Sequence, residues 1–135
     1  MKKLAAALSV VLISAIQGCG PQGHPAAPAP GPAAAQISLV LDKGAIAPEQ
    51  GQAYTYPTPQ FADRSDDGKN PNRSGLVLLE DGKPLGPAHS VHQDIRDKGQ
   101  GRWSHWGGFV YFSSSDGSDP RRNQKKYELG SAAQP

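Results

Sequence analysis

The dipeptide Asp81-Gly82 constrains the fold of this chain more than any other local feature. It lies between an apolar run at residues 75–80 and a shorter one at residues 83–85. A two-residue hairpin loop of type I′ needs positive φ at both central residues, and Asp-Gly is among the pairs that meet that need best. We therefore predict a β-hairpin here. Its return strand should be short or lie at a sheet edge, because Pro84 has no N–H to donate.

A second hairpin is predicted around Gly107-Gly108. The run before this turn, residues 102–106, contains both tryptophans of the chain, and the run after it, residues 109–113, reads Phe-Val-Tyr-Phe-Ser. Successive side chains of a strand point to opposite faces of the sheet. The aromatic residues of this hairpin should therefore divide between a face that packs in the core and a face that does not.

The remaining segments favour an all-β fold. Gly and Pro together number 29 of 135 residues, and hydrophobic residues make up only 36%, so we expect many turns around a modest core. Three further strand patterns occur, at residues 37–41, 53–56 and 127–129. Residues 63–73 contain only turn formers and charged residues, which predicts an exposed loop. With at most one short helix, near Ser90, the chain should form a small antiparallel sandwich or barrel of short strands with long loops.

The N-terminus has the pattern of a secretory signal. Two lysines precede an apolar run that is too short to cross a bilayer as a helix. The run ends in Ile-Gln-Gly followed by Cys19, and this tetrapeptide resembles the lipobox of bacterial lipoproteins, although Ile and Gln depart from its commoner residues. The resemblance implies that residues 1–18 are a signal peptide, removed before Cys19, and that Cys19 carries the lipid. Several acyl chains together anchor a protein stably to a membrane.

The same resemblance implies a location and a domain order. Gly20, rather than Asp, follows the cysteine, which points to the outer membrane if the host is Gram-negative and otherwise to the cell envelope in general. Residues 19–35 are rich in Pro and Ala and predict a flexible tether. We expect a β-rich domain at residues 36–129 and a frayed C-terminus at residues 130–135.

The charge of the chain argues against nucleic acid as a partner. Removal of Lys2 and Lys3 with the signal leaves 12 Lys and Arg against 12 Asp and Glu. A neutral chain has no overall attraction for a polyanion. The predicted contacts are instead a membrane, through the lipid anchor, and a glycan or another envelope protein.

The central segment resembles an uncharacterised module of bacterial surface-carbohydrate proteins. The residues that carry the likeness are E-D-G-x-x-L-G-P-A-H-x-x-H-x-x-I-R from Glu80, then G-R-W-S-H-W and Y-F-S-x-S-D-G-S-D-P-R. The likeness covers residues 73–127, and no catalytic domain accompanies it on this chain. It implies a β-rich accessory or binding domain and points toward glycans, without an activity to carry over.

Three histidines form the best candidate cluster for chemistry. His89 and His92 meet on one face if they lie on a helical turn, and His105 from the second hairpin can complete a zinc or copper site. Hydrogen bonding of these histidines to backbone groups is the favoured alternative, and a divalent metal is the only cofactor that the sequence brings into question. Ser90 beside them, with Asp94 as an orienting carboxylate, gives a candidate hydrolytic set, but no G-x-S-x-G motif is present.

A binding role is better supported by the sequence than catalysis. Indole faces stack on sugar rings, and charged side chains can bond the sugar hydroxyls. The candidate ligand-binding residues are Trp103, Trp106, Arg96, Arg102 and Asp94. The two tryptophans are three apart and so lie on opposite faces of a regular strand, which means that at most one is a binding platform. We therefore predict a lipid-anchored binding domain; a metal-dependent or hydrolytic enzyme and a structural lipoprotein without ligand remain alternatives.

Overall fold

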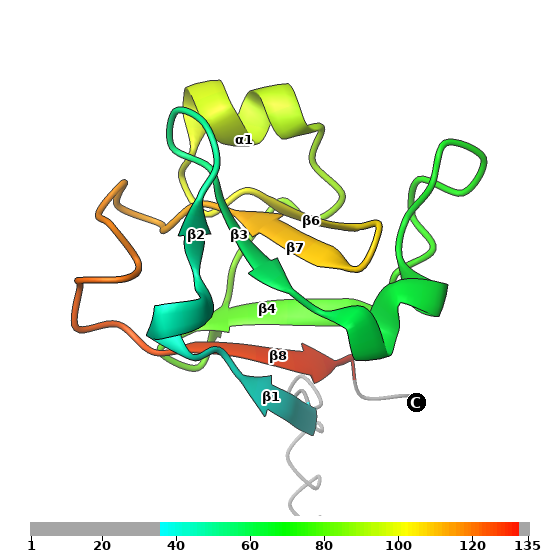
Figure 1. The fold of residues 1–135 in the computed structure, drawn as a ribbon, viewed down its shortest axis with the longest axis horizontal. Helices are drawn as coiled ribbons and strands as arrows, with labels where there is room; N and C mark the ends of the chain where they lie inside the picture. Colours follow the sequence, from blue (N-terminus) through cyan, green and yellow to red (C-terminus); the bar gives the residue numbers. More distant parts are fainter. Residues whose placement is uncertain (1–35, 133–135) are drawn as a thin grey trace, which may run out of the picture.

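A computed structural model describes residues 36–132 as two four-stranded antiparallel sheets that pack face to face (Figure 1). The first sheet has the strand order β1 (Gln36–Val40), β8 (Tyr127–Ser131), β4 (Leu76–Glu80) and β5 (Lys83–Pro84). The second has the order β2 (Ala47–Pro48), β3 (Tyr54–Pro57), β7 (Phe109–Phe112) and β6 (Trp103–Trp106). The prediction of a small all-β sandwich is confirmed.

The first predicted hairpin is formed by β4 and β5. Asp81 and Gly82 have φ of 51° and 76°, the left-handed values that a type I′ turn requires. β5 is only two residues long and forms the edge of its sheet, as the proline in it predicts.

The second predicted hairpin, β6 to β7, turns at Gly107 and Gly108, with φ of 58° and 80°. Along β7 the side chains alternate as predicted. Val110 and Phe112 are fully buried, whereas Phe109 on the opposite face is exposed. β6 lies at the edge of the second sheet, so the outer side of this strand pairs with no other strand of the sheet and can hydrogen-bond to neighbouring loops.

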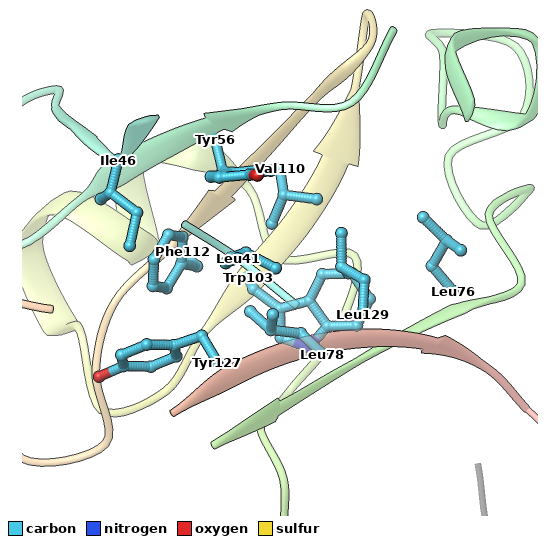
Figure 2. Packing of buried hydrophobic residues seen from close by; sticks show 10 residues of the cluster. All are labelled: Leu41, Ile46, Tyr56, Leu76, Leu78, Trp103, Val110, Phe112, Tyr127 and Leu129. Atoms are coloured by element: carbon cyan, nitrogen blue, oxygen red, sulfur yellow. The ribbon is translucent and has the colours of Figure 1, made fainter. Parts of the chain in front are cut away.

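The core fills the space between the two sheets (Figure 2). Trp103 from β6, Phe112 from β7 and Leu78 from β4 are among its fully buried members. The whole cluster comprises Leu41, Ile46, Tyr56, Leu76, Leu78, Trp103, Val110, Phe112, Tyr127 and Leu129. Large aromatic side chains supply much of the buried area, which explains how a chain with a low hydrophobic share can form one continuous core.

One short α-helix, α1 (His92–Lys98), covers the outer face of the second sheet, and two 3-10 turns, η1 (Lys43–Ala45) and η2 (Pro59–Arg64), flank the strands (Figure 1). Ile95 is the residue of α1 that is completely buried. The helix ends at Gly99, whose φ of 57° is unfavourable for residues with a side chain. This helix leaves part of the sheet's outer face uncovered near its own first turn, and the candidate site lies there.

Two predictions about chain segments need correction. The C-terminal end does not fray from Gly130, because Gly130 and Ser131 belong to β8 and pair with both β1 and β4. Residues 63–73 are not simply an exposed loop, because Ser65 and Asp66 are buried. The backbone N–H of Asp66 donates to the carbonyl of His105 at 2.8 Å, and this bond draws the segment against the open edge of β6.

The predicted signal peptide, Cys19 and tether lie outside the described residues. Among residues 36–132, no helix is both long enough and apolar enough to cross a bilayer.

Candidate functional site

A cavity of about 390 Å³ opens between the start of α1, the loop before it, the segment after η2 and the outer face of β6. We call it the His89 cleft. Its lining residues are Asp66, Pro71, His89, Ser90, Val91, His92, Ser104 and Trp106. They come from three segments that are far apart in the sequence, so the fold and not a local motif creates the cleft.

The alternation of side chains along β6 decides what the cleft contains. Trp103 and His105 point into the sandwich and are buried. Ser104 and Trp106 point the other way and line the cleft. Trp106 is 39% exposed, whereas tryptophan residues are on average highly buried. Part of its surface is therefore available to a ligand.

Asp66 is a buried carboxylate whose two oxygens have different partners. Oδ1 accepts a hydrogen bond from the backbone N–H of Ser74 at 2.8 Å. Oδ2 lies 2.7 Å from Nδ1 of His89. The side chain is only 2% exposed, so both bonds form in a setting where electrostatic interactions are strong. The backbone contact fixes the carboxylate, and the carboxylate in turn fixes the imidazole.

His89 itself has a strained backbone. Its φ of 55° lies in the left-handed region, where a residue with a Cβ is disfavoured. The loop is fastened to β6 on both sides of His89. Trp103 N donates to the carbonyl of Pro87 at 3.3 Å, and Ser90 N donates to the carbonyl of Trp103 at 3.0 Å. Strain of this kind is typical of functional positions that the surrounding structure holds in place.

His92 forms an aromatic wall of the cleft. Its ring stacks on Tyr111 with centroids 3.9 Å apart, and it meets Trp106 edge-on at 6.1 Å. Burial lowers the pKa of His92, the nearby Arg96 charge lowers it further, and Glu49 opposes them in part. His92 is therefore neutral at pH 7 and contributes a flat, uncharged surface.

Not all buried polar groups of the domain are satisfied. Ser104 Oγ, His105 Nε2 and Thr58 Oγ1 are buried and have no hydrogen-bond partner among residues 36–132. His105 Nδ1 lies 2.9 Å from Ser74 Oγ, so His105 and Asp66 are linked through the same serine residue. Burial lowers the pKa of His105, although the charge of Asp66 opposes the shift. Unsatisfied buried polar groups are rare in folded proteins, and two of these three are in β6.

The predicted three-histidine metal site does not form. His89 is bonded to Asp66, His92 is stacked on Tyr111, and His105 points into the sandwich from the opposite face of its strand. Within residues 36–132, no three histidine, cysteine, aspartate or glutamate side chains are grouped so that they could hold a metal ion. The candidate metal site, the less favoured of the two interpretations of these histidines, did not account for the face of β6 from which His105 projects.

Of the five predicted ligand-binding residues, only Trp106 lines the cleft. Trp103 is in the core, where its Nε1 donates to the carbonyl of Leu85 at 3.1 Å. Arg96 Nε donates to Glu49 at 2.9 Å. Arg102 donates to the carbonyl of Gly99, and Asp94 pairs with Lys98 at 2.9 Å. These three charged side chains stabilise α1 and its neighbouring turns and do not face the cleft.

The predicted hydrolytic set is also not assembled. Ser90 Oγ donates to the carbonyl of Pro87 at 2.7 Å, and the carboxylate beside His89 is Asp66 rather than Asp94. Two residues of the cleft, Asp66 and Ser104, were not among the candidates predicted from the sequence. The expected alternation along residues 102–106 pointed to Ser104, since it assigns Ser104 and Trp106 to one face. Nothing in the sequence near Asp66 distinguishes it from the other aspartates of its loop.

Searches of protein-family models, of curated proteins and of solved structures found no match to this chain. The functional argument therefore depends on the geometry of the cleft.

Proposed function

We propose that this chain is a lipid-anchored protein of the cell envelope whose His89 cleft binds an uncharged carbohydrate. The half-exposed indole of Trp106 at the wall of a cavity with buried hydrogen-bonding groups is the observation that carries the proposal. A volume of about 390 Å³ lies within the range of small-molecule sites. It suits one or two sugar rings.

The apolar surfaces of the cleft favour a ligand with a flat apolar face. A sugar ring has such a face, formed by its C–H groups, and it packs on an aromatic ring without losing the hydration of its hydroxyls. Trp106 supplies the aromatic ring, and His92 meets it edge-on, which limits its rotation. Val91, which is exposed, extends the apolar surface at the rim.

The polar groups of the cleft favour an uncharged ligand. His89 and Ser90 provide a nitrogen and a hydroxyl group of the kind that bond sugar hydroxyls. Neither lysine nor arginine is among the lining residues of the described chain, and the one acidic residue there is Asp66. A uronic acid or a phosphorylated sugar would find no counter-ion and would be repelled by that carboxylate.

An array of neutral and acidic glycans tests this function, with the full chain purified in detergent as the probe. We expect binding to neutral glycans and a loss of more than about tenfold in affinity for Trp106→Ala. Phe109→Ala is the matched control, because Phe109 is a similarly exposed aromatic residue of the same hairpin that does not line the cleft. Equal binding by the wild type and Trp106→Ala would reject the proposal.

A second candidate function is docking of another envelope protein. Val91, Trp106 and Phe109 are all exposed apolar residues, and Phe109 pairs with Trp106 across the hairpin. Exposed apolar groups of this kind occur at protein interfaces. The same two variants separate the functions when cross-linking to envelope proteins is measured beside the glycan array. Loss of cross-links in both Trp106→Ala and Phe109→Ala indicates protein docking, whereas loss of glycan binding in Trp106→Ala alone indicates sugar binding.

The lipid anchor is a separate part of the proposal, and it depends on Cys19 and the apolar run before it. Replacement of Cys19 by Ala removes the thiol to which the lipid would be attached. We expect this variant to lose incorporation of labelled palmitate and to leave the membrane fraction. Labelling that persists in Cys19→Ala would show that the residue is not the lipidation site.

A further inference from the structure

We propose that His89 is the specificity-determining residue of the cleft. Asp66 holds it in the tautomer that carries its proton on Nδ1, so that Nε2 presents a hydrogen-bond acceptor to a donating hydroxyl of an uncharged sugar. This inference rests on the proposed function of the cleft. It assigns the direction of one hydrogen bond, and with it the chemical group that the ligand must provide.

The tautomer follows from the chemistry of the partner. An ionised carboxylate has no proton to donate, so the 2.7 Å contact between Asp66 Oδ2 and His89 Nδ1 needs the proton on Nδ1. In a neutral imidazole the other nitrogen then has a free lone pair. Because Nδ1 is already occupied, Nε2 is the nitrogen that can serve a ligand in the cleft.

The surroundings keep this arrangement rigid. Asp66 cannot rotate freely, because Oδ1 accepts from the backbone N–H of Ser74. His89 cannot withdraw easily, because Pro87 and Ser90 on either side of it are hydrogen-bonded to the backbone of Trp103. The imidazole nevertheless remains 25% exposed, so it is accessible from the cleft. A preorganised acceptor of this kind favours a correctly placed donor, since binding costs little further ordering.

The same arrangement predicts what the cleft rejects. A group that offers only lone pairs, such as a carboxylate, sulfate or ether oxygen, would face the lone pair of Nε2 without a proton between them. A site built to bond a hydroxyl discriminates strongly against an analogue that lacks it, because the buried polar group is left unpaired. We therefore expect a free hydroxyl on the ligand at this position, and methylation of that hydroxyl should abolish binding.

The tautomer of His89 can be measured without any ligand, by long-range ¹H–¹⁵N correlation NMR of the full chain in detergent micelles at pH 7.5. We expect protonated Nδ1 and unprotonated Nε2. Protonation of Nε2 in the wild type, alone or together with Nδ1, would overturn the proposal, whatever the variants do. A failure of this test is distinct from a failure of the proposed function, because the glycan array reports only whether sugars bind.

Asp66→Asn gives the sharpest variant. The backbone N–H of Ser74 needs an acceptor, so the amide oxygen of the new side chain should take the place of Oδ1 and its NH₂ group should face His89. The proton of His89 should then move to Nε2, and the cleft should present a donor in place of an acceptor. Asp119→Asn is the matched control, because Asp119 bonds Arg121 and does not line the cleft.

Binding supplies the second readout. For a neutral glycan selected on the array, we expect Asp66→Asn to lose about tenfold or more in affinity and Asp119→Asn to lose none. An unchanged tautomer in a folded Asp66→Asn protein would overturn the proposal. So would unchanged affinity once the tautomer has switched. If the variant does not fold, the wild-type tautomer and the methylated ligand still decide the question.

Discussion

Two buried carboxylates, Glu80 and Asp66, occupy opposite roles in this domain. Glu80, at the end of β4, is 8% exposed at its side chain and fully surrounded by donors. It accepts from the backbone N–H of Ser115 at 3.0 Å, from the Ser115 hydroxyl, from Lys125 at 2.8 Å and from Tyr127 at 3.2 Å. We call this group the Glu80 network.

Asp66 is also buried, but one of its partners lines a cavity. The imidazole that it fixes is part of the wall of the His89 cleft, whereas none of the described partners of Glu80 lines that cleft. The difference distinguishes two uses of a buried charge. A carboxylate whose partners all belong to the fold holds segments together, and one that orients a side chain toward a cavity prepares a site.

The electrostatics of the Glu80 network fit a structural role. Burial alone would raise the pKa of Glu80, but hydrogen bonds from Lys125 and Ser115 outweigh it, and the pKa is held below its usual value. Lys125 also pairs with Asp116 at 2.8 Å. The network thus ties the loop after β7 to the first sheet.

The largest predicted effect is on stability and comes from the Glu80 network. Glu80→Ala should lower the free energy of unfolding by about 3 kcal/mol, because it leaves the buried hydroxyl of Tyr127 and the largely buried ammonium of Lys125 without their acceptor. Urea denaturation measures the change. Glu49→Ala is the control: its ion pair with Arg96 is more exposed and should contribute less than about 1 kcal/mol. Binding of neutral glycans should be unchanged in both variants.

A smaller loss of stability is expected at Asp66, together with a loss of binding. Asp66→Ala removes the acceptor of the buried N–H of Ser74 and should cost about 2 kcal/mol. Unlike Glu80→Ala, it should also abolish glycan binding at protein concentrations where the variant is folded. Retained binding in the folded variant would mean that Asp66 is structural, as Glu80 is.

The pH dependence of stability should separate the two regions. Burial lowers the pKa of His92 and His105, so the folded state binds fewer protons than the unfolded state just below pH 6.5. The contribution of the two neutral histidines to the free energy of unfolding is complete above about pH 6.5. On the order of 1 kcal/mol of that free energy should be lost as the pH falls toward 5. The pKa of Glu80 is also lowered, but from an ordinary value of 4.5. The contribution of the Glu80 carboxylate to the free energy of unfolding should therefore be lost only below about pH 4.5.

Denaturation curves at a series of pH values check this separation. His105→Gln should remove most of the loss between pH 6.5 and 5, and Glu80→Gln should flatten the curve only at lower pH. A single loss of stability confined to pH below 4.5 in the wild type would contradict the assignment of lowered pKa values to His92 and His105.

The smallest predicted effect concerns the backbone strain at His89. An L residue in the left-handed region costs about 1–2 kcal/mol relative to glycine. His89→Gly should therefore be more stable than His89→Ala by about 1 kcal/mol, although neither variant should bind sugar. Thermal denaturation of the pair measures the difference, and their equal stability would show that the φ of 55° stores no strain.

The hairpins and the division of aromatic side chains could be predicted because they depend on neighbouring residues. Asp-Gly and Gly-Gly turns and the alternation along a strand are local rules, and both hairpins follow them. The strand near the C-terminus was also predicted, but not that it lies between β1 and β4, since sheet order depends on contacts between distant segments.

The cleft could be predicted only in part. Trp106 and His89 stood out as candidates by residue type, and both line the cavity. Asp66 did not, because its partners Ser74 and His89 are 8 and 23 residues away and its own surroundings look like a solvated loop. The arginines were assigned to ligand binding on charge alone. The ion pair of Arg96 with Glu49 and the bond of Arg102 to the Gly99 carbonyl could not be predicted from the sequence.

The most direct test of the central claim, that the His89 cleft and not the Glu80 network is the functional region, is chemical-shift mapping. The ¹⁵N-labelled protein is titrated with a neutral oligosaccharide identified on the array. The account predicts saturable shifts at the Trp106 indole N–H and at Val91, His92 and Ser104, with Ser115 and Lys125 unmoved. Shifts centred on Ser115 and Lys125, or none near Trp106, would contradict it.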